Sequence, residues 1–246
     1  MMTGFSKLLT TEAKLVRREP ATLFFALVFG PALITLFGLL PAFHKHEPSL
    51  GGLTTLDVYV PTVIVLALAL AALNALPQAL SSYRDKGYLR RMSTTPVSPA
   101  ALLASQLTVV SAVSALSLAA IAGISRAFGV GFAGNPAGYL LALVLTALEL
   151  FAIGLAVAAL SPSSKVTGPV GAVLTFPTMF FAGLWVPRAQ MPALLRRIGD
   201  YTPLGAGQHA LQDAWAGRWP GLLDLAVMAA YAAVFGLAAA RTFRWE

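Results

Sequence analysis

Residues 58–80 read VYVPTVIVLALALAALNALPQAL, and this stretch decides the class of the fold. It contains no charged side chain, and as a helix rising about 1.5 Å per residue it is long enough to cross about 30 Å of hydrocarbon. Five further apolar runs of similar length lie along the chain, at 21–43, 100–128, 137–160, 166–186 and 221–240. The sequence therefore predicts an all-α integral membrane protein, a single transmembrane domain of six helices over residues 1–246.

The composition agrees with a membrane protein. Hydrophobic residues make up 57% of the chain and charged residues 11%, whereas soluble domains have about 45–50% and about 25%. The absence of cysteine excludes disulfide scaffolds and thiolate metal sites. The formal net charge of +7 comes from Lys and Arg residues spread along an apolar chain. This distribution favours basic membrane loops, and we expect no nucleic-acid partner.

The distribution of Lys and Arg predicts the orientation, because cytoplasmic loops keep an excess of positive charge. With both termini in the cytoplasm, the cytoplasmic segments carry eleven basic residues: Lys7, Lys14, Arg17, Arg18, Arg84, Lys86, Arg90, Arg91, Lys165, Arg241 and Arg244. The opposite side carries six: Lys45, Arg126, Arg188, Arg196, Arg197 and Arg218. We therefore expect both termini to be cytoplasmic.

Residues 1–20 have an amphipathic pattern ahead of the first apolar run. Apolar side chains recur near helical spacing between basic ones: Phe5, Leu8, Leu9, Leu15 and Val16. The run that follows is longer than the core of a signal peptide. We expect an amphipathic helix on the inner leaflet that ends at Pro20; a frayed basic tail is the alternative.

The segment 81–99, SSYRDKGYLRRMSTTPVSP, joins the second and third runs and is rich in charge. Tyr88, Leu89 and Met92 fall on one face of a short helix that the following prolines would end. Such a helix, with apolar anchors and an arginine pair, suits docking into a groove of a cytoplasmic partner. Basic charges that only set the topology at lipid headgroups are the alternative.

This segment also resembles the cytoplasmic signature of type-2 ABC exporter permeases. The shared pattern is an arginine and an acid, a glycine, a hydrophobic and arginine-rich turn, and Thr-Pro-Val-Ser at 95–98. The usual Gly-Thr-Leu of the family is Gly-Tyr-Leu in this chain. The resemblance is greatest to bacterial drug and antibiotic efflux permeases of the daunorubicin-resistance type. It implies that nine residues couple the chain to an ATPase: Tyr83, Arg84, Asp85, Lys86, Gly87, Tyr88, Leu89, Arg90 and Arg91.

A second match follows the fifth run, over residues 187–220. The sequence Gly-Leu-Trp-Val-Pro at 183–187 and Tyr-Thr-Pro-Leu at 201–204 resembles the family's short helices that re-enter the outer leaflet. Helical spacing places apolar side chains on one stripe: Met191, Leu194, Leu195 and Ile198. The resemblance implies extracytoplasmic re-entrant helices, with an outer gate at Pro187, Met191, Pro192 and Pro203. An ordinary outer loop is the alternative.

The resemblance also implies partners and a function. Family members work in the cytoplasmic (inner) membrane as two membrane subunits, identical or paired, bound to two P-loop ATP-binding subunits. ATP and Mg would then bind the partner, and the chain would contact membrane lipid and a small hydrophobic substrate. The implied activity is export of hydrophobic or amphipathic molecules, with multidrug efflux and antibiotic resistance as the expected role. Export of a lipid-linked glycan is the alternative within the family.

The chain itself lacks the motifs of an enzyme. It has no Gly-rich phosphate loop followed by Lys and Ser or Thr, no Gly-x-Ser-x-Gly elbow and no paired histidines around a glutamate. His44, His46 and Glu47 are loop neighbours without a fourth ligand, so we expect no metal site. We therefore expect a permease component that hydrolyses no ATP itself.

Glu149 is the one charged residue deep within an apolar run, because Arg126 and Asp224 lie near run ends from which they can reach the interface. A carboxylate there costs several kcal/mol unless it faces protein, a polar partner or water. It either contacts substrate or protons, or fixes packing through an interhelical hydrogen bond. Weaker candidates for the translocation path are Asn74, Ser111, Ser114, Phe176, Phe180 and Phe181.

A gradient-driven secondary carrier with Glu149 as its coupling site is the alternative from another class. Carriers of that kind often contain inverted repeats and interrupted helices. The sequence shows no internal repeat, although Pro31, Pro77, Pro169 and Pro177 predict kinked helices. An ATP-driven permease subunit is the better interpretation.

Overall fold

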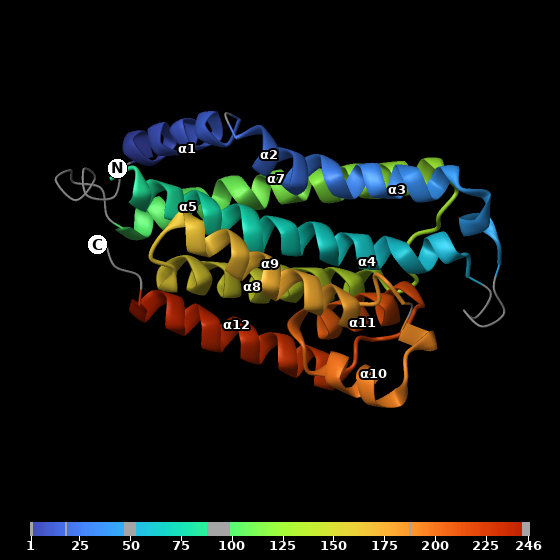
Figure 1. Cartoon of the computed structure of the whole chain (residues 1–246). Helices are drawn as coiled ribbons and strands as arrows, with labels where there is room; N and C mark the ends of the chain where they lie inside the picture. The colour runs from blue at the N-terminus through green and yellow to red at the C-terminus, as the bar shows by residue number, and fades with distance from the viewer. Residues whose placement is uncertain (1, 18, 47–52, 88–98, 187, 243–246) are drawn as a thin grey trace.

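The computed structural model describes residues 2–17, 19–46, 53–87, 99–186 and 188–242, and within them the protein is an elongated helical bundle without a β-strand (Figure 1). The α-helices are α1 (Met2–Arg17), α2 (Pro20–Leu23), α3 (Phe29–Leu39), α4 (Thr55–Ala69), α5 (Leu76–Asp85), α7 (Pro99–Ala127), α8 (Pro136–Leu160), α9 (Ser164–Phe181), α10 (Ala193–Asp200), α11 (Pro203–Trp215) and α12 (Leu222–Thr242). Two π-helical segments, η1 (Phe24–Val28) and η4 (Leu70–Ala75), and two 3-10 turns, η2 (Pro41–His44) and η5 (Arg188–Gln190), complete the described chain.

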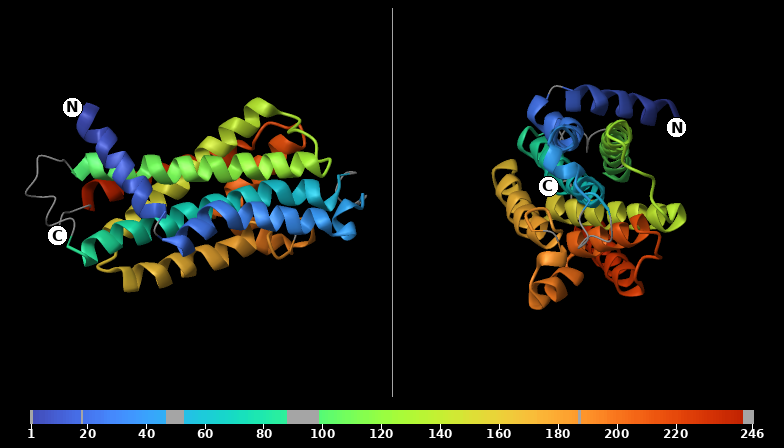
Figure 2. Two further views of the ribbon diagram at one scale, coloured as in Figure 1. Left: turned by 90° about the horizontal axis from the view of Figure 1, so that it is seen from above. Right: turned by 90° about the vertical axis from the view of Figure 1, so that its right-hand side faces the viewer.

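The long helices lie side by side and alternate in direction (Figure 1). We call the end that holds α1 and the end of α5 the proximal end, and the end that holds α10 and the start of α4 the distal end. The helix α1 crosses the proximal end obliquely to the long helices (Figure 2). Consecutive long helices are therefore joined alternately at the two ends, as expected of a multi-pass membrane protein.

Four helices among the described residues are long and apolar enough to cross a membrane. They are Thr55–Asp85, Ala101–Ala127, Pro136–Leu160 and Leu222–Thr242. The predicted runs 21–43 and 166–186 correspond to the shorter apolar helix Phe24–Leu39 and to α9. The membrane class is therefore supported, while the count of six spans stays a prediction.

The continuous helix formed by α4, η4 and α5 is the centre of the bundle. It begins with a reciprocal cap, in which the Thr54 hydroxyl accepts from the Asp57 amide at 3.1 Å and the Asp57 carboxylate accepts from the Thr54 amide at 2.9 Å. Every residue over 60–69 is buried, as expected for a helix that is apolar on all faces. The helices α3, α7, α8 and α11 pack around it.

The two π-helical segments each precede a proline. Pro31 follows η1 and Pro77 follows η4. A proline ring crowds the carbonyl four residues earlier in a regular helix, and in both cases that carbonyl lies inside the π segment. The wider π-helical turn leaves room for the proline ring. The sequence predicts kinked helices at these prolines, and at Pro31 and Pro77 the irregularity is a short change from α-helix to π-helix. In contrast, Pro169 and Pro177 lie inside an uninterrupted α9.

Two neighbouring helices approach the backbone of η4 closely. A Cβ atom on Gly154 of α8 would lie 1.9 Å from the Ala72 carbonyl oxygen, and one on Gly171 of α9 would lie 2.6 Å from the Leu73 carbonyl oxygen. A side chain at either position would collide with this backbone. Glycine therefore lets α8 and α9 pack directly against η4.

The helix α1 forms as the sequence predicts, and it packs on the bundle. Leu8 and Leu15 lie against a small cluster that contains Tyr83 of α5 and Leu102 of α7. The helix ends at Arg17, before Pro20 begins α2. Its placement on the inner leaflet stays a prediction.

The predicted outer segment 187–220 contains two helices, α10 and α11. The helix α11 is an internal element, because residues 204–208 are buried and it packs on α8, α12 and α4. The helix α10 is peripheral and leaves Leu194 and Ile198 exposed. The predicted apolar stripe is therefore divided, since Met191 is buried and lies before the first turn of α10.

Candidate functional site

At the proximal end, α5 is tied to α1 by a buried hydrogen bond. The Tyr83 hydroxyl donates to the Glu12 carboxylate, and both side chains are buried. Burial raises the pKa of Glu12 above its ordinary value, and the hydrogen bond from Tyr83 opposes this shift. The position of α1 is thus linked to the end of the central helix.

Arg84 and Asp85, which follow Tyr83, connect the end of α5 to α8 and α9. The Arg84 guanidinium donates to the Ser161 carbonyl at the end of α8. The Asp85 carboxylate accepts from the Ser164 amide at 3.0 Å and from the Ser164 hydroxyl. An acidic group at the first turn of α9 suits the partial positive charge of a helix start. A displacement of this end of α5 therefore acts directly on α8 and α9.

The predicted coupling segment is described only in part. Lys86 is exposed and Gly87 has a positive φ of 66°, a conformation that glycine adopts without strain. The remaining predicted coupling residues, Tyr88, Leu89, Arg90 and Arg91, lie outside the described residues.

Glu149 is fully buried at the contact of α8 with α11. Among the described residues neither carboxylate oxygen has a hydrogen-bond partner. A Cβ atom on Gly207 of α11 would lie 3.3 Å from the Glu149 Oε1 atom and 2.7 Å from the Thr146 Oγ1 atom. Glycine therefore brings the α11 backbone against this carboxyl group, and the described residues supply none of the hydrogen bonds that a packing role would use.

The other translocation candidates lie on separate elements. The Asn74 amide of η4 donates to the Thr175 hydroxyl of α9 at 2.9 Å. Ser114 of α7 is buried and Ser111 is half-buried. Phe176 is exposed, while the rings of Phe180 and Phe181, both half-buried, meet edge to face at 5.6 Å. None of these residues lines the two cavities described next.

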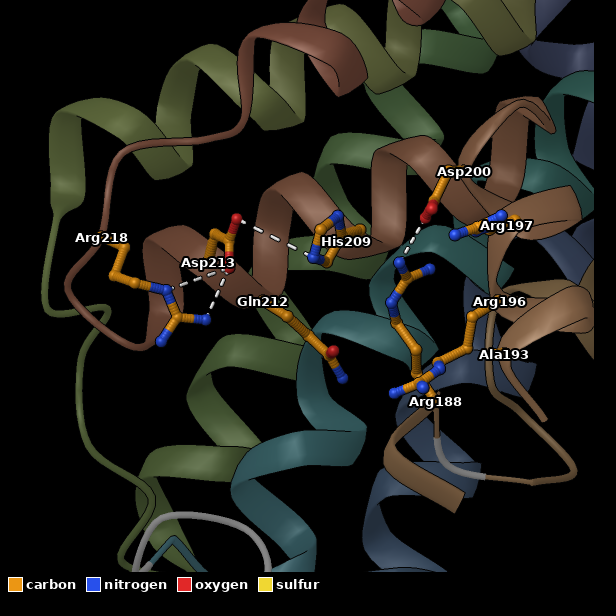
Figure 3. Close-up of a pocket in the computed structure, with 9 residues that line it drawn as sticks. All are labelled: Arg188, Ala193, Arg196, Arg197, Asp200, His209, Gln212, Asp213 and Arg218. Carbon is orange, nitrogen blue, oxygen red and sulfur yellow. Dashed lines mark hydrogen bonds and ion pairs between the residues drawn. The ribbon is translucent and has the colours of Figure 1, made fainter. Parts of the chain in front are cut away.

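The larger cavity, which we call the distal cavity, has a volume of about 580 Å³ and is lined mainly by charged residues (Figure 3). Its lining residues are Arg188, Ala193, Arg196, Arg197, Asp200, His209, Gln212, Asp213 and Arg218. Ion pairs join Arg188 to Asp200 and, at 2.6 Å, Arg218 to Asp213. In the sequence, the only sign of this cavity is the set of four arginines between 188 and 218, a pattern that by itself indicates membrane topology.

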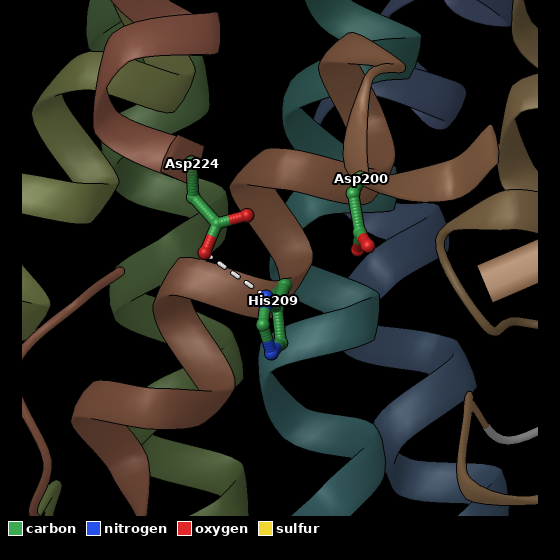
Figure 4. A group of neighbouring side chains, drawn as sticks. All are labelled: Asp200, His209 and Asp224. Atoms are coloured by element: carbon green, nitrogen blue, oxygen red, sulfur yellow. Dashed lines mark ion pairs between the residues drawn. The ribbon is translucent and has the colours of Figure 1, made fainter. Parts of the chain in front are cut away.

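His209 connects the distal cavity to α12. Its Nδ1 atom lies 2.9 Å from the Asp224 carboxylate (Figure 4), and its Nε2 atom lies 3.9 Å from the Asp213 carboxylate (Figure 3). The hydrogen bond with Asp224 raises the pKa of His209, assisted by the charges of Asp224 and Asp213 and opposed by burial and by Arg188. Asp224 lies in the first turn of α12, near the end of the apolar run as expected, and it is buried and pairs with the neighbouring helix α11.

The ligand atoms of Asp200, His209 and Asp224 lie within 4.8 Å of one another. This spacing is compatible with a metal ion, but the charges around it are not. Arg188 pairs with Asp200, and further arginines line the same cavity. We therefore interpret the group as part of an ion-pair network.

A second cavity of about 350 Å³ is mostly apolar and also lies toward the distal end. Arg126 lies at its edge, with its guanidinium carbon 4.1 Å from the ring centroid of Phe132. The buried Tyr139 hydroxyl lines the cavity and has no partner among the described residues. Arg126 therefore stays at the helix end, as the sequence predicts.

The predicted outer-gate residues have different positions. Met191 is buried, Pro192 precedes the first turn of α10, and Pro203 is the first residue of α11. Pro187 lies outside the described residues. Proline is favourable at a helix start, because the first backbone N–H groups of a helix have no partner within it and proline has no such group.

The fold and the two ends of the bundle define a helical, multi-pass membrane protein without a catalytic constellation among the described residues. The profile of the ABC-2 family transporter proteins matches residues 43–241. The chain therefore belongs to the ABC-2 family of transporter proteins. A comparison with curated proteins finds no match.

Family membership makes the chain a transport component of an ABC transporter rather than a catalytic domain. Permeases of this family normally pair with an ATP-binding subunit. The resemblance seen in the sequence is thus confirmed at the level of the family.

Proposed function

We propose that the chain is the membrane subunit of an ATP-driven exporter of hydrophobic or amphipathic molecules. Two copies, or one copy and a related permease, would associate with two ATP-binding subunits that bind ATP and Mg. The six predicted helical runs would span the cytoplasmic membrane with both termini inside. The drug and antibiotic efflux permeases are the proposed subtype, on the form of residues 95–98.

The attachment of α5 is the observation that supports this mechanism best. Arg84 and Asp85 belong to the predicted coupling segment, and Arg84 is hydrogen-bonded to the end of α8. Asp85 is hydrogen-bonded to the start of α9. Closure of the ATPase dimer would move the segment and shift these helices together, a rigid-body step driven by the different affinities of the two states for ATP.

Copurification of an ATPase tests the proposal. The full chain is co-expressed with its adjacent genes and purified in mild detergent, and is compared with a variant carrying Tyr88→Ala and Arg90→Glu. We expect a P-loop ATPase to copurify with the unchanged chain and to be lost from the variant. Failure to recover any ATPase with the unchanged chain would overturn the proposed function.

A matched control separates coupling from general damage. The pair Phe132→Ala and Arg126→Glu makes comparable changes, an aromatic residue to alanine and an arginine to glutamate, at exposed positions of the distal end. This variant should keep the ATPase. Equal loss of the ATPase from both variants would contradict the coupling role of residues 88–91. The elution volume of each variant in size-exclusion chromatography shows whether it is folded.

The buried Glu149 supports the second candidate, a gradient-driven carrier. Its carboxyl group has no hydrogen-bond partner among the described residues, so no described hydrogen bond assigns it to a packing role. Transport is measured in vesicles after ATP depletion, with the proton gradient maintained. Transport that persists and is abolished by Glu149→Gln would favour the carrier, whereas loss of transport on ATP depletion favours the exporter.

A further inference from the structure

The distal cavity has an excess of positive charge. Four arginines and two aspartates line it, so the lining is formally two charges positive before His209 is counted. The aspartates pair with Arg188 and Arg218. Among the described residues no carboxylate pairs with Arg196 or Arg197, which leaves two guanidinium groups available to an anion.

The arginines surround the cavity. Arg188, Arg196 and Arg197 lie on one side and Arg218 lies on the other, with His209 and Gln212 between them (Figure 3). Guanidinium groups offer planar arrays of N–H donors that match the oxygens of a phosphate group. The Gln212 amide adds a neutral donor. The lining thus has the chemistry of a phosphate-binding site.

The two faces of α10 place this cavity at a membrane surface. At about 100° per residue, Arg196, Arg197 and Asp200 share one face of α10, and Leu194 and Ile198 share the opposite face. The charged face lines the cavity, while Leu194 is 70% exposed and Ile198 is 43% exposed. A helix with exposed apolar side chains on one face and charged side chains on another is stable when its apolar face contacts lipid.

Exposed aromatic side chains at the same end support this position. Trp185 follows α9, Tyr201 separates α10 from α11, and Trp219 precedes α12, and all three are exposed. Tryptophan and tyrosine gather at the level of lipid headgroups. The arginines of the distal cavity therefore lie close to the depth at which lipid phosphates lie.

We propose that the distal cavity binds the phosphate group of an amphipathic molecule, with Arg196 and Arg197 as its principal ligands. The apolar part of the molecule would extend out of the cavity into the lipid layer that Leu194 and Ile198 contact. Asp200 and Asp213 hold Arg188 and Arg218 in position. The ligand is a phosphate-bearing lipid or exported amphiphile; free phosphate shares the same chemistry and is distinguished by the test.

Binding is measured on the full chain, purified without an ATPase in a nonionic detergent. The probes are dihexanoyl phosphatidic acid, inorganic phosphate and dihexanoylglycerol, which lacks the phosphate. The shift of the thermal unfolding midpoint with probe concentration gives each dissociation constant. We expect saturable binding of phosphatidic acid and no shift with dihexanoylglycerol.

Variants locate the binding. Arg196→Gln together with Arg197→Gln should weaken phosphatidic acid binding about tenfold or more, because two charge-assisted contacts are lost. The control Arg241→Gln removes an exposed arginine at the proximal end of α12, and it should leave the dissociation constant unchanged. Each single variant provides the same comparison if the double variant does not fold.

The outcomes separate the possible sources of the phosphate. Tighter binding of phosphatidic acid than of inorganic phosphate identifies an amphiphile, and equal affinity identifies free phosphate. The absence of saturable binding by either probe, or an unchanged dissociation constant in the arginine variants, would overturn the proposal. Because no ATPase is present, this result is independent of the proposed transport function.

Discussion

At the scale of single residues, buried and half-buried ionisable side chains join helices that are distant in the sequence. Glu12 meets Tyr83 at the proximal end, and His209 meets Asp224 at the distal end. Each pair includes a residue whose protonation changes the interaction. The stability of both ends therefore depends on pH. The proton is taken up by the carboxyl group of Glu12 at the proximal end and by the imidazole ring of His209 at the distal end.

The raised pKa of Glu12 predicts that α1 is held less firmly at high pH. The folded protein binds a proton at Glu12 more tightly than the unfolded chain does, so this contribution is complete below the ordinary value of 4.5. It is lost as the pH rises through the raised pKa. Glu12→Gln should remove this pH dependence, which hydrogen exchange of the α1 amides measures after correction for intrinsic rates.

Glu19→Gln is the control for this comparison, because Glu19 lies after the end of α1. It should keep the pH dependence of the unchanged protein. An identical pH profile in the Glu12→Gln variant would contradict the role of this carboxyl group.

His209 predicts a second pH dependence, at the distal end. Its pKa is raised, so the stability from its pairing with Asp224 is complete below the ordinary value of 6.5 and is lost as the pH rises through the raised value. The loss should be at most about 1 kcal/mol, because the ring is partly exposed to solvent. Asp224→Asn should flatten the profile of unfolding midpoint against pH; a profile as steep as that of the unchanged protein would exclude this pair as its cause.

At the scale of elements, glycines set how closely the helices approach the central one. The π segment η4 and the glycines at 154 and 171 form one unit, in which backbone carbonyls meet the backbone of α8 and α9. The sequence shows both glycines and Pro77, and it predicts an irregular helix. It does not show which carbonyl each glycine meets, because that depends on the register between helices.

Gly154→Ala should destabilise the protein by about 1–3 kcal/mol, the usual cost of overpacking. The added Cβ atom would lie 1.9 Å from the Ala72 carbonyl oxygen, so α8 would have to move away from η4. Gly123→Ala is the matched control, since a Cβ atom there has nothing within 4 Å. That control should be neutral or stabilising by up to about 1 kcal/mol, and thermal unfolding in detergent compares the two. Equal stabilities would contradict the close packing at η4.

At the scale of the whole molecule, the two ends of the bundle differ in their connections. The proximal end carries α1, the end of α5 and the start of α9, close to the proposed coupling segment. The distal end carries the distal cavity, the apolar cavity and the exposed aromatic residues. This difference between the ends suits a permease that would be moved by its ATP-binding subunits at the proximal end and would contact its substrate or lipid at the distal end.

The predicted orientation, with both termini in the cytoplasm, rests on the excess of basic residues in the segments assigned to that side. The chain has no cysteine, so a single introduced cysteine is labelled without background. Phe132→Cys at the distal end should react with an impermeant maleimide in intact cells, whereas Lys86→Cys at the proximal end should react only after permeabilisation. The reverse pattern would show that the termini lie outside.

The sequence by itself determined the class of the protein and the order of its elements. Long apolar runs specify membrane helices through the local cost of exposing backbone and charge to lipid, and the pattern at 81–99 specified the family. The helices α1, α10 and α11 also followed from the spacing of apolar residues and prolines. These features depend on neighbours along the chain, so they can be predicted without the fold.

Only the tertiary structure decided which buried groups meet. Asp224 pairs with His209, because α11 lies inside the bundle beside α12. Four arginines that set the topology in the sequence also line one cavity in space. Hydropathy is summed along the chain, whereas a cavity or an ion pair depends on the register and rotation of helices far apart in sequence, which packing of the whole bundle fixes.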